Sequence, residues 1–374
     1  MEALVTSRIP FQGVYQGRRV LVTGHTGFKG SWLTAWLLRL GAEVCGYSDG
    51  LPTQPSLFEA MGVAGAIRHE LGDIRDLRRI TGIVRSFRPD FIFHLAAQAI
   101  VSTSYVAPLD TIAVNVIGTA TVLDVLRSVH HACVAVIITS DKAYDNVEWA
   151  WGYRENDRLG GKDVYSGSKG AAELIFNAYH HSFFQNDGPV RLSSTRAGNV
   201  IGGGDWAKDR IVADCVRAWH RGDPVDIRSP QATRPWQHVL EPLSGYLALG
   251  AALSRDNRLH GESFNFGPRA EQNATVIELL RDLASIWGFD DPRAAYRVVN
   301  EVPFHEASLL KLNIDKTLMS LRWQPTLTYD ECVAMTGGWY RDVVRQGGEA
   351  SSRTDADIAR YESLAQARHL AWAS

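Results

Sequence analysis

The sequence predicts an α/β protein with a doubly wound parallel sheet and a second, smaller mixed α/β domain. Two observations support this prediction. Short apolar runs typical of strands alternate with helical segments up to about residue 197, the pattern of a parallel sheet with helices on both faces. Beyond that point the rhythm changes to loops, short strands and separate helices. The length of 374 residues allows two or three domains with a sizeable core.

Three glycines join the first predicted strand to the first predicted helix. They lie three residues apart, between an apolar run at 20–22 and a segment at 31–40 with helical apolar spacing. Glycines let backbone N–H groups approach a pyrophosphate at the positive end of a helix, so this turn can bind a dinucleotide. A tight turn without a ligand is the alternative, because the spacing is not G-x-G-x-x-G. The candidate cofactor-binding residues of the turn are Gly24, Thr26, Gly27, Phe28, Lys29 and Gly30.

Further cofactor contacts are expected where the next three strands end. An acidic residue at the end of the second strand usually binds the adenosine ribose of NAD, but here Ser48 precedes Asp49. This position alone therefore does not separate NAD from NADP. Asp73, followed by Ile74, meets the adenine or is a solvated turn residue. Small side chains after the fourth strand leave room for a flat cofactor, and the candidates there are Ala96, Ala97 and Gln98.

The predicted elements divide the chain into two domains and a tail. An NAD-binding Rossmann domain spans 17–197 with a return at 236–266, and a substrate domain combines 198–235 with 267–346. The tail at 347–374 is polar and alanine-rich and is expected to be a loosely attached helix. Residues 1–17 are a lead-in that is either mobile or draped over the first domain. We expect further strands at 43–47, 91–98, 134–140 and 263–266, and one more strand that ends at 71–75. We expect helices at 115–129, 209–221, 239–253, 275–287 and 328–346.

Composition argues against several other functions. A net charge of −2, from 39 basic and 41 acidic residues without a basic block, disfavours nucleic acid as a partner. Four widely separated cysteines without C-x-x-C indicate a reducing compartment, so we expect a cytoplasmic protein. The scattered histidines predict no metal site. No apolar run of about 18 residues and no signal-peptide pattern are seen, so we expect no membrane span.

A tyrosine and a lysine four residues apart are the first candidate catalytic pair. Tyr165 and Lys169 would lie on the same face of a helix. The ammonium would lower the pKa of the phenol, as would an oxidised nicotinamide, and the tyrosine could then remove a proton from a sugar hydroxyl. The spacing is common by chance, so a plain surface helix is the alternative.

The fifth predicted strand ends in a second candidate catalytic group. The carboxyl ends of parallel strands face the ligand crevice, which places Ser140, Asp141 and Lys142 there. Ser140 donates a hydrogen bond to the reacting oxygen, or only caps a helix. Asp141 and Lys142 place an acid beside a base, or form a solvated loop pair.

These motifs resemble those of the extended short-chain dehydrogenase/reductase family. The resemblance rests on Thr23-Gly24-x-x-Gly27-x-x-Gly30, on Asn115 as a further cofactor contact, and on Tyr165-x-x-x-Lys169. A narrower similarity, to the nucleotide-sugar 4,6-dehydratases of this family, covers the chain to about residue 340. It rests on the runs at 24–30, 139–142, 151–156, 196–206 and 234–239.

The narrower resemblance implies a redox-neutral dehydration of CDP-glucose with NAD as cofactor, in deoxysugar formation for a surface polysaccharide. Tyr165, with Lys169, would take the 4-hydroxyl proton while NAD accepts the C4 hydride, which returns to C6 after water is lost. Asp141 matches the acid that protonates the leaving hydroxyl. Lys142 stands where related enzymes have a glutamate as the C5 base, and a lysine is a base only if its pKa is depressed.

The resemblance also implies how substrate and subunits are held. Arg234 matches an arginine that binds the substrate diphosphate, although it could instead brace Glu241 in an ion pair. Asn199, Asp209 and Arg210 lie on the same predicted substrate side. The family implies a homodimer or homotetramer whose interface uses the helix of Tyr165.

Two other functions stay open at this point. One is an epimerase, or a dehydratase of another nucleotide sugar, although the run at 139–142 disfavours a simple epimerase, which needs no acid for a leaving group. The other is a non-catalytic NAD-binding module, which need not keep a proton-transfer set.

Overall fold

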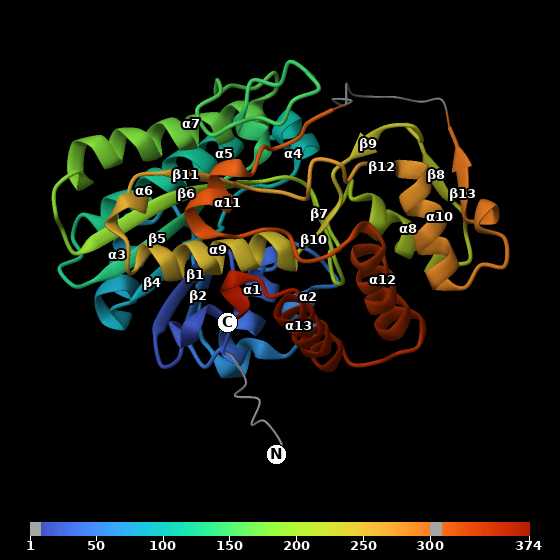
Figure 1. The fold of residues 1–374 in the computed structure, drawn as a ribbon, viewed down its shortest axis with the longest axis horizontal. Coiled ribbons are helices and arrows are strands. Elements are labelled where there is room, and N and C mark those ends of the chain that lie inside the picture. The colour runs from blue at the N-terminus through green and yellow to red at the C-terminus, as the bar shows by residue number, and fades with distance from the viewer. Residues whose placement is uncertain (1–8, 300–308) are drawn as a thin grey trace.

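A seven-stranded parallel sheet forms the centre of the protein (Figure 1). The computed structural model describes residues 9–299 and 309–374. The strand order is β11-β6-β5-β4-β1-β2-β3, so the order reverses between β1 and β4 and opens a crevice at the carboxyl ends of these strands. This confirms the predicted doubly wound sheet. The strands are β1 Arg19–Thr23, β2 Glu43–Ser48, β3 Arg68–Leu71, β4 Phe91–His94, β5 Cys133–Ile138, β6 Val190–Ala197 and β11 Ser263–Phe266.

Helices cover both faces of the sheet because the strands are apolar on both sides. In β1, Val20 and Val22 belong to one core cluster, and Leu21 between them belongs to the other. The first cluster packs under α1 Phe28–Arg39, α9 Leu240–Leu253 and α13 Ala350–Ala367. The second packs under α3 Leu77–Phe87, α6 Gly118–Leu126 and α7 Val164–Tyr179, on the opposite face in Figure 1.

One apolar helical segment departs from expectation. The helical turns α5 Pro108–Ile112, η3 Ala113–Ile117 and α6 run on continuously over 19 residues, and an 18-residue window within them has a mean hydropathy of 1.5. By length and composition alone this segment could cross a membrane, so the expectation that no such run exists was wrong. Half of it is buried inside the protein, where α6 packs on α3 and α7, as a core helix does.

A smaller group of elements lies beside the sheet, at the right of Figure 1. Its helices are near their predicted positions, whereas its two- and three-residue strands are too short to show a periodic pattern. The helices are α8 Ile211–His220, α10 Val276–Trp287 and α12 Tyr329–Tyr340. The strand pairs are β8 Val225–Ile227 with β13 Tyr296–Val298, β9 Thr233–Arg234 with β12 Ala274–Thr275, and β7 Val200–Ile201 with β10 Gln237–His238.

The C-terminal tail is part of the core, so the expectation of a loosely attached helix was wrong. Ile358 and Tyr361 on α13 are fully buried, because apolar residues recur there at helical spacing among exposed charges. Trp372 stacks on Tyr361 at 5.5 Å and on Phe11 at 5.1 Å between ring centroids. Phe11 belongs to η1 Pro10–Gly13, so this part of the lead-in is draped over the sheet domain; the first eight residues lie outside the described range.

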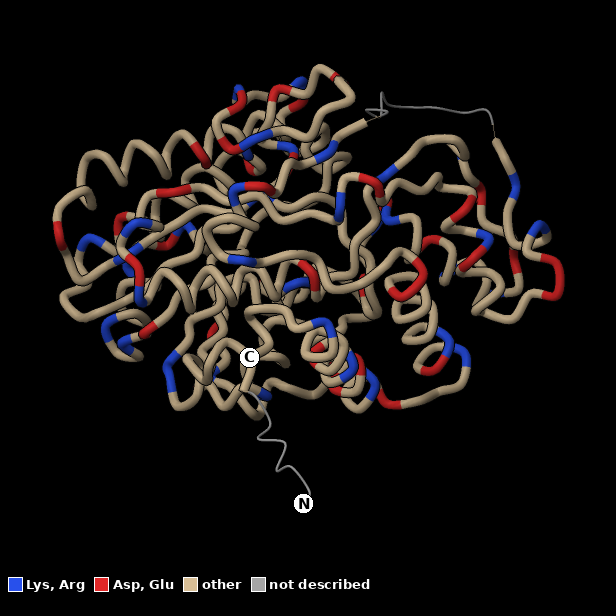
Figure 2. Tube along the Cα trace, viewed as in Figure 1, with Lys and Arg blue, Asp and Glu red and all other residues tan. Residues whose placement is uncertain are grey.

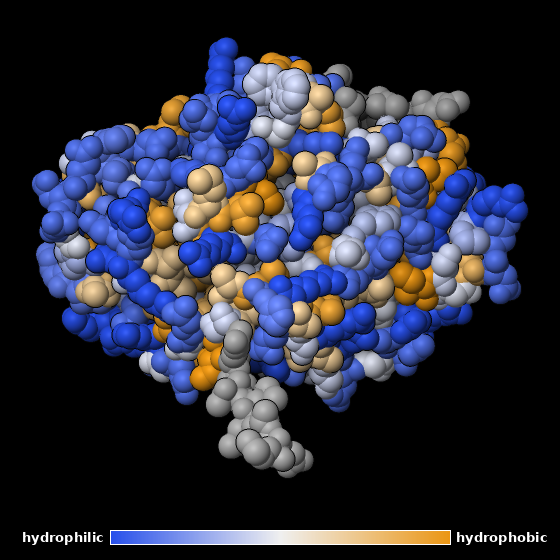
Figure 3. Space-filling model, in the orientation of Figure 1, coloured by the Kyte–Doolittle hydropathy of each residue, from blue (hydrophilic) through white to orange (hydrophobic). Residues whose placement is uncertain are grey.

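The surface carries both signs of charge. Lys and Arg are interspersed with Asp and Glu over the whole trace in Figure 2. The face seen in Figure 3 is mainly hydrophilic, with hydrophobic residues in small groups.

Candidate active site

The turn between β1 and α1 leaves no space for side chains at two of its glycines. A Cβ on Gly24, whose φ is +76°, would lie 2.7 Å from the backbone nitrogen of Ala96. A Cβ on Gly30 would lie 2.1 Å from the carbonyl oxygen of Gly24. Gly27 caps α1 without any side-chain hydrogen bond. The turn therefore presents backbone N–H donors and the positive end of a helix to the crevice, which suits a diphosphate.

Ser48 and Thr26 brace this turn against the end of β2. The hydroxyl of Ser48 lies 2.9 Å from Nδ1 of His25 and accepts a 3.4 Å hydrogen bond from the Thr26 nitrogen. The Thr26 hydroxyl donates to the carbonyl oxygen of Gly50 at 2.6 Å. Both predicted cofactor residues thus lie at the crevice edge and fix its shape.

Asp73 already has a cationic partner. Its carboxylate accepts hydrogen bonds from the backbone nitrogen and Nε of Arg75, at 2.8 and 2.9 Å. The hydrogen bonds from Arg75 lower the pKa of Asp73. The next residue, Ile74, is buried where a Cβ on Gly118 would strike it. This is the arrangement of a turn aspartate.

Asn115 ties the loop after β4 to the helix of the tyrosine. Its Oδ1 accepts from the Gln98 nitrogen at 2.8 Å, and its Nδ2 donates to the Gln98 carbonyl oxygen at 3.1 Å. The same Nδ2 lies 2.9 Å from the hydroxyl of Ser168 on α7. The loop with Ala96 and Ala97 is therefore held in place from two sides.

Tyr165 and Lys169 lie in the crevice, which rules out a plain surface helix. They are 7% and 6% exposed, and the Lys169 ammonium lies 5.9 Å from the Tyr165 ring centroid. Burial, then the charge of Lys29, lowers the pKa of Lys169 to about 8. Burial also raises the pKa of Tyr165, and the cation that opposes this is Arg210. The pKa of Tyr165 is thus raised and not lowered as expected, because desolvation disfavours the phenolate, and the groups that oppose this are Arg210 and Ser140, not Lys169.

Ser140 caps a helical turn and also contacts two other candidate catalytic side chains. Its hydroxyl accepts from the Lys142 nitrogen at 3.2 Å, which caps η4 Asp141–Ala143, and donates to Oδ1 of Asp141 at 2.9 Å. It also hydrogen-bonds Tyr165 and thereby lowers the pKa of that phenol. Asp141 is only 5% exposed, so it is not part of a solvated pair. Within the described residues the half-buried Lys142 side chain makes no hydrogen bond or ion pair.

Lys29 reaches from the glycine turn toward this cluster. Its ammonium lies 6.0 Å from the ring centroid of Tyr246 on α9. Burial lowers the pKa of Lys29 to about 8, and the charges of Asp141, Arg210 and Asp205 act on the same group. A residue expected only to bind cofactor therefore also belongs to the surroundings of Asp141.

The predicted substrate residues come from several segments. Asp209 accepts a 2.6 Å hydrogen bond from Ser102, and Arg210 caps α8 and lies within charge range of Tyr165. Asn199 follows β6 and precedes β7. Arg234 is on β9 and donates to the carbonyl oxygen of Thr233 at 2.9 Å.

Glu241, the alternative partner of Arg234, has donors of its own. Its carboxylate accepts from the backbone nitrogens of Thr326 and Leu327 and from the Tyr361 hydroxyl, at 2.6–3.0 Å. Burial raises the pKa of Glu241 to about 7. The carboxylate thus links α9 to the C-terminal segments.

An ion pair that the sequence did not indicate anchors the catalytic helix. Glu173 on α7 and Arg196 on β6 lie 2.9 Å apart with side chains 0% and 2% exposed. The Ser194 hydroxyl donates a hydrogen bond to Glu173 at 2.8 Å, and Arg196 donates one to the Tyr144 hydroxyl at 2.7 Å. Glu173 lies one turn beyond Lys169, so the pair fixes the helix beneath the crevice. Only the spacing 165, 169, 173 could have signalled it.

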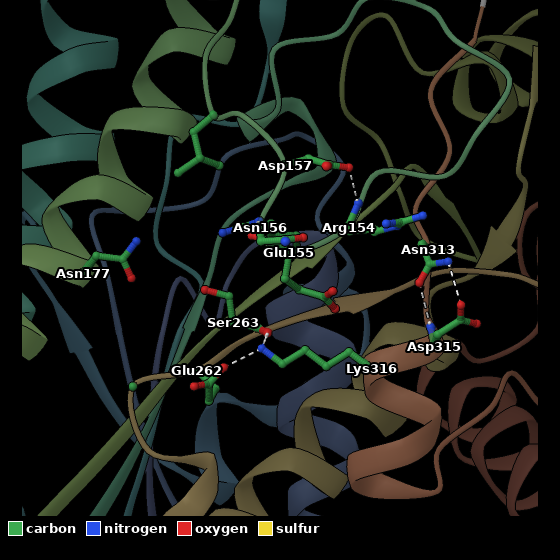
Figure 4. Close-up of a pocket in the computed structure, with 13 residues that line it drawn as sticks. Arg154, Glu155, Asn156, Asp157, Asn177, Glu262, Ser263, Asn313, Asp315 and Lys316 are labelled. Atoms are coloured by element: carbon green, nitrogen blue, oxygen red, sulfur yellow. Dashed lines mark hydrogen bonds and ion pairs between the residues drawn. The ribbon is translucent and has the colours of Figure 1, made fainter.

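A separate polar cavity of about 640 Å³ has Arg196 of this ion pair among its lining residues (Figure 4). None of the predicted site residues lines it. Lys316 extends across the cavity and donates a hydrogen bond to Glu262 at 2.6 Å. Glu155 enters the cavity from the loop before α7, and burial raises the pKa of its carboxyl group. Within residues 9–299 and 309–374, no group of three or more His, Cys, Asp or Glu side chains could hold a metal ion.

Comparison with known proteins defines the class. Residues 21–336 match the family described as GDP-mannose 4,6 dehydratase. The chain belongs to this family, which is of the extended short-chain dehydrogenase/reductase kind.

Individual relatives narrow the similarity. The chain is 45% identical over 353 residues to CDP-glucose 4,6-dehydratase of Salmonella typhimurium, covering 93% of this chain and 97% of the relative. It is 26% identical over 344 residues to dTDP-glucose 4,6-dehydratase of Haemophilus influenzae, covering 86% and 97%. The solved structure of DesIV, the dTDP-glucose 4,6-dehydratase of Streptomyces venezuelae with NAD and TYD bound, matches with a TM-score of 0.74 at 23% identity, covering 88% and 99%. This match confirms the Rossmann fold.

Proposed function

We propose that this protein is an NAD-dependent hydro-lyase that converts CDP-D-glucose to CDP-4-dehydro-6-deoxy-D-glucose. The observation that carries the proposal is the group of Tyr165, Ser140 and Asp141 beside the carboxyl end of β5, in which Tyr165 and Asp141 are buried and Ser140 contacts both. Oxidation at C4 followed by elimination across C5 and C6 needs a base, a hydrogen-bond donor and an acid in one crevice. The 45% identity to a CDP-glucose 4,6-dehydratase supports the choice of substrate.

The crevice fits NAD because no side chain can occupy the glycine turn. A Cβ on Gly24 or Gly30 would strike the backbone, so the turn stays closely packed at the N-terminus of α1, where its N–H groups can meet a diphosphate. When bound, NAD supplies a site that takes up the C4 hydride and gives it back at C6. The residues proposed to hold it are Gly24, Thr26, Gly27, Phe28, Lys29, Gly30, Ser48, Asp73, Ile74, Ala96, Ala97, Gln98, Asn115, Tyr165 and Lys169.

Proton transfer at C4 belongs to Tyr165. Its phenol is the group placed to take the 4-hydroxyl proton, and the Ser140 hydroxyl, once it turns its proton from Asp141 to Tyr165, stabilises the phenolate. The Lys169 ammonium adds a positive charge 5.9 Å from the ring. The 4-ketone that results makes the C5 hydrogen acidic.

Elimination belongs to Asp141 and Lys142. Asp141 gives its proton to the 6-hydroxyl, and Lys142 takes the C5 proton, so the C6–O bond breaks and one water leaves. The half-buried Lys142 side chain has no carboxylate partner among the described residues. Asn199, Asp209, Arg210 and Arg234 are proposed to hold the nucleotide diphosphate and sugar.

The assembly proposed is a homodimer, or a tetramer built from it. Val106 on α4 Val101–Val106 is 86% exposed, and Leu109 on α5 is 81% exposed. Both elements pack on α7, where Leu174 is 58% exposed. Exposed apolar side chains that gather on neighbouring helices are typical of an interface between subunits. The four cysteines are free and buried, which supports a cytoplasmic location.

One incubation tests the proposed function. The purified chain is given CDP-glucose and, separately, the dTDP-, UDP- and GDP-hexoses, and products are followed by mass spectrometry. We expect loss of one water with CDP-glucose and none in a Tyr165→Phe variant that still binds cofactor. A changed configuration at constant mass would indicate an epimerase. Unchanged sugars throughout would indicate a cofactor-binding module.

A further inference from the structure

Gln237 on β10 is a buried polar side chain that the proposed mechanism does not use. It is 1% exposed, and among the described residues neither its amide nitrogen nor its amide oxygen has a hydrogen-bond partner. Its neighbour His238 points the other way, toward Trp32, with ring centroids 5.7 Å apart. Buried amides are almost always hydrogen-bonded, so an unpaired one indicates a ligand.

The amide of Gln237 converges with the proposed acid on one point. A Cβ built on Gly198 would lie 3.7 Å from Nε2 of Gln237 and 3.4 Å from Oδ2 of Asp141. The other carboxylate oxygen of Asp141 is the one that receives the Ser140 hydroxyl, at 2.9 Å. Oδ2 and Nε2 therefore share the space over Gly198, where the absence of a side chain leaves room for one small polar group.

An amide suits this position better than a charged donor. The Gln237 amide is neutral, so it can donate a hydrogen bond without stabilising the anionic form of Asp141 as an ammonium would. An oxygen held over Gly198 can accept from Nε2 while it receives a proton from Asp141. A leaving hydroxyl needs both contacts.

Resting on the proposed function, we propose that Gln237 and Asp141 together bind the 6-hydroxyl of the sugar. Nε2 of Gln237 donates a hydrogen bond to the hydroxyl oxygen, the Asp141 proton moves to that oxygen, and the C6–O bond breaks to release water. Gln237 is thus a second residue that contacts the leaving hydroxyl. It is on β10, whereas Ser140 and Asp141 follow the end of β5.

The test compares two substrates in a Gln237→Met variant, which keeps the length of the side chain and removes the amide. CDP-glucose carries the 6-hydroxyl, and CDP-6-deoxyglucose lacks it but can still be oxidised at C4. We expect dehydration of CDP-glucose to fall about 100-fold, the usual effect of losing one oriented donor. Oxidation of CDP-6-deoxyglucose, seen as reduced nicotinamide absorbance, stays at the wild-type level. Equal losses with both sugars, or no loss with either, would overturn the inference.

Binding gives a readout that does not depend on turnover. Calorimetric titration measures the ratio of the dissociation constants of CDP-glucose and CDP-6-deoxyglucose, which we expect to move toward one in Gln237→Met because one of the two contacts to the 6-hydroxyl is lost. If this ratio were the same in Gln237→Met and wild type, Gln237 would not contact the 6-hydroxyl. That conclusion would hold even if the enzyme dehydrated a different nucleotide sugar. Thr336→Val is the control, since it removes a buried polar group on α12, and it should alter neither the ratio nor the rate.

Discussion

At the scale of single residues, two lysine side chains lie buried near each other in the crevice. The pKa values of Lys29 and Lys169 are both lowered to about 8, in each case chiefly by burial. Two neighbouring ammonium groups repel each other, which raises the free energy of the site. A negative charge that develops beside them offsets this repulsion. Tyr165 is the group that acquires such charge when it loses its proton.

The first prediction concerns pH. Below about pH 8 the Tyr165–Lys169 pair holds both of its protons, so kcat/KM should rise with pH as the pair loses the first one and the remaining proton stays on Lys169 while the phenol acts as base. In Lys169→Arg the cation no longer titrates, and the rising limb then reports Tyr165, whose pKa burial raises. Rate profiles should show the limb displaced to higher pH. A limb that stays in place would assign the titration to another group.

The second prediction separates oxidation from elimination. Lys142→Ala removes the proposed C5 base, so C4 oxidation should proceed while water loss falls by about 10²–10⁴-fold. Persistent reduced-nicotinamide absorbance with little product in the mass spectrum is the expected result. Lys162→Ala, at an exposed lysine on the loop before α7, is the control. Normal turnover in Lys142→Ala would place the base elsewhere.

At the level of elements, the glycine turn works by close backbone contact. Gly30→Ala would place a methyl group 2.1 Å from the Gly24 carbonyl oxygen, so α1 would have to shift away from the turn. We expect weak cofactor retention and a lower melting temperature, measured on the same preparation. Gly82→Ala is the opposite case: it lies within α3 with nothing near its Cβ, and should stabilise the protein by about 0.5–1 kcal/mol. A Gly30→Ala protein that retained cofactor normally would contradict this account.

At the level of the whole molecule, the two ends of the chain close the core. Trp372 is 5% exposed and lies between Phe11 and Tyr361. Trp372→Ala should lower the free energy of unfolding by about 3–5 kcal/mol, as for other buried aromatic truncations. Denaturant titration measures this change. A loss below about 1 kcal/mol would mean that the tail is only loosely attached after all.

The proposed dimer is tested by charging its apolar surface. Leu109→Asp should convert the dimer to a monomer in sedimentation experiments, because a carboxylate would be buried without a partner. Met319→Asp is the control, since Met319 is 85% exposed on α11 Asp315–Leu321, outside that surface. A Leu109→Asp protein that sediments like the wild type would place the interface elsewhere.

The sequence by itself determined the features that local spacing encodes. Apolar alternation located the strands, the glycines located the turn, and the four-residue interval placed Tyr165 and Lys169 on one helix face. The small residues after β4 and the run at 140–142 followed from the rule that strand ends face the crevice. Each of these features depends on residues close together in the chain.

Only the tertiary structure decided what meets across the chain. Arg196 pairs with Glu173, Gln237 approaches Asp141 over Gly198, and the tail packs on residues near the N-terminus. Nothing in the local sequence distinguishes these side chains from surface ones, because their burial depends on elements tens to hundreds of residues away. For the same reason the pKa of Tyr165, which depends on burial more than on its neighbouring lysine, could not be predicted from spacing.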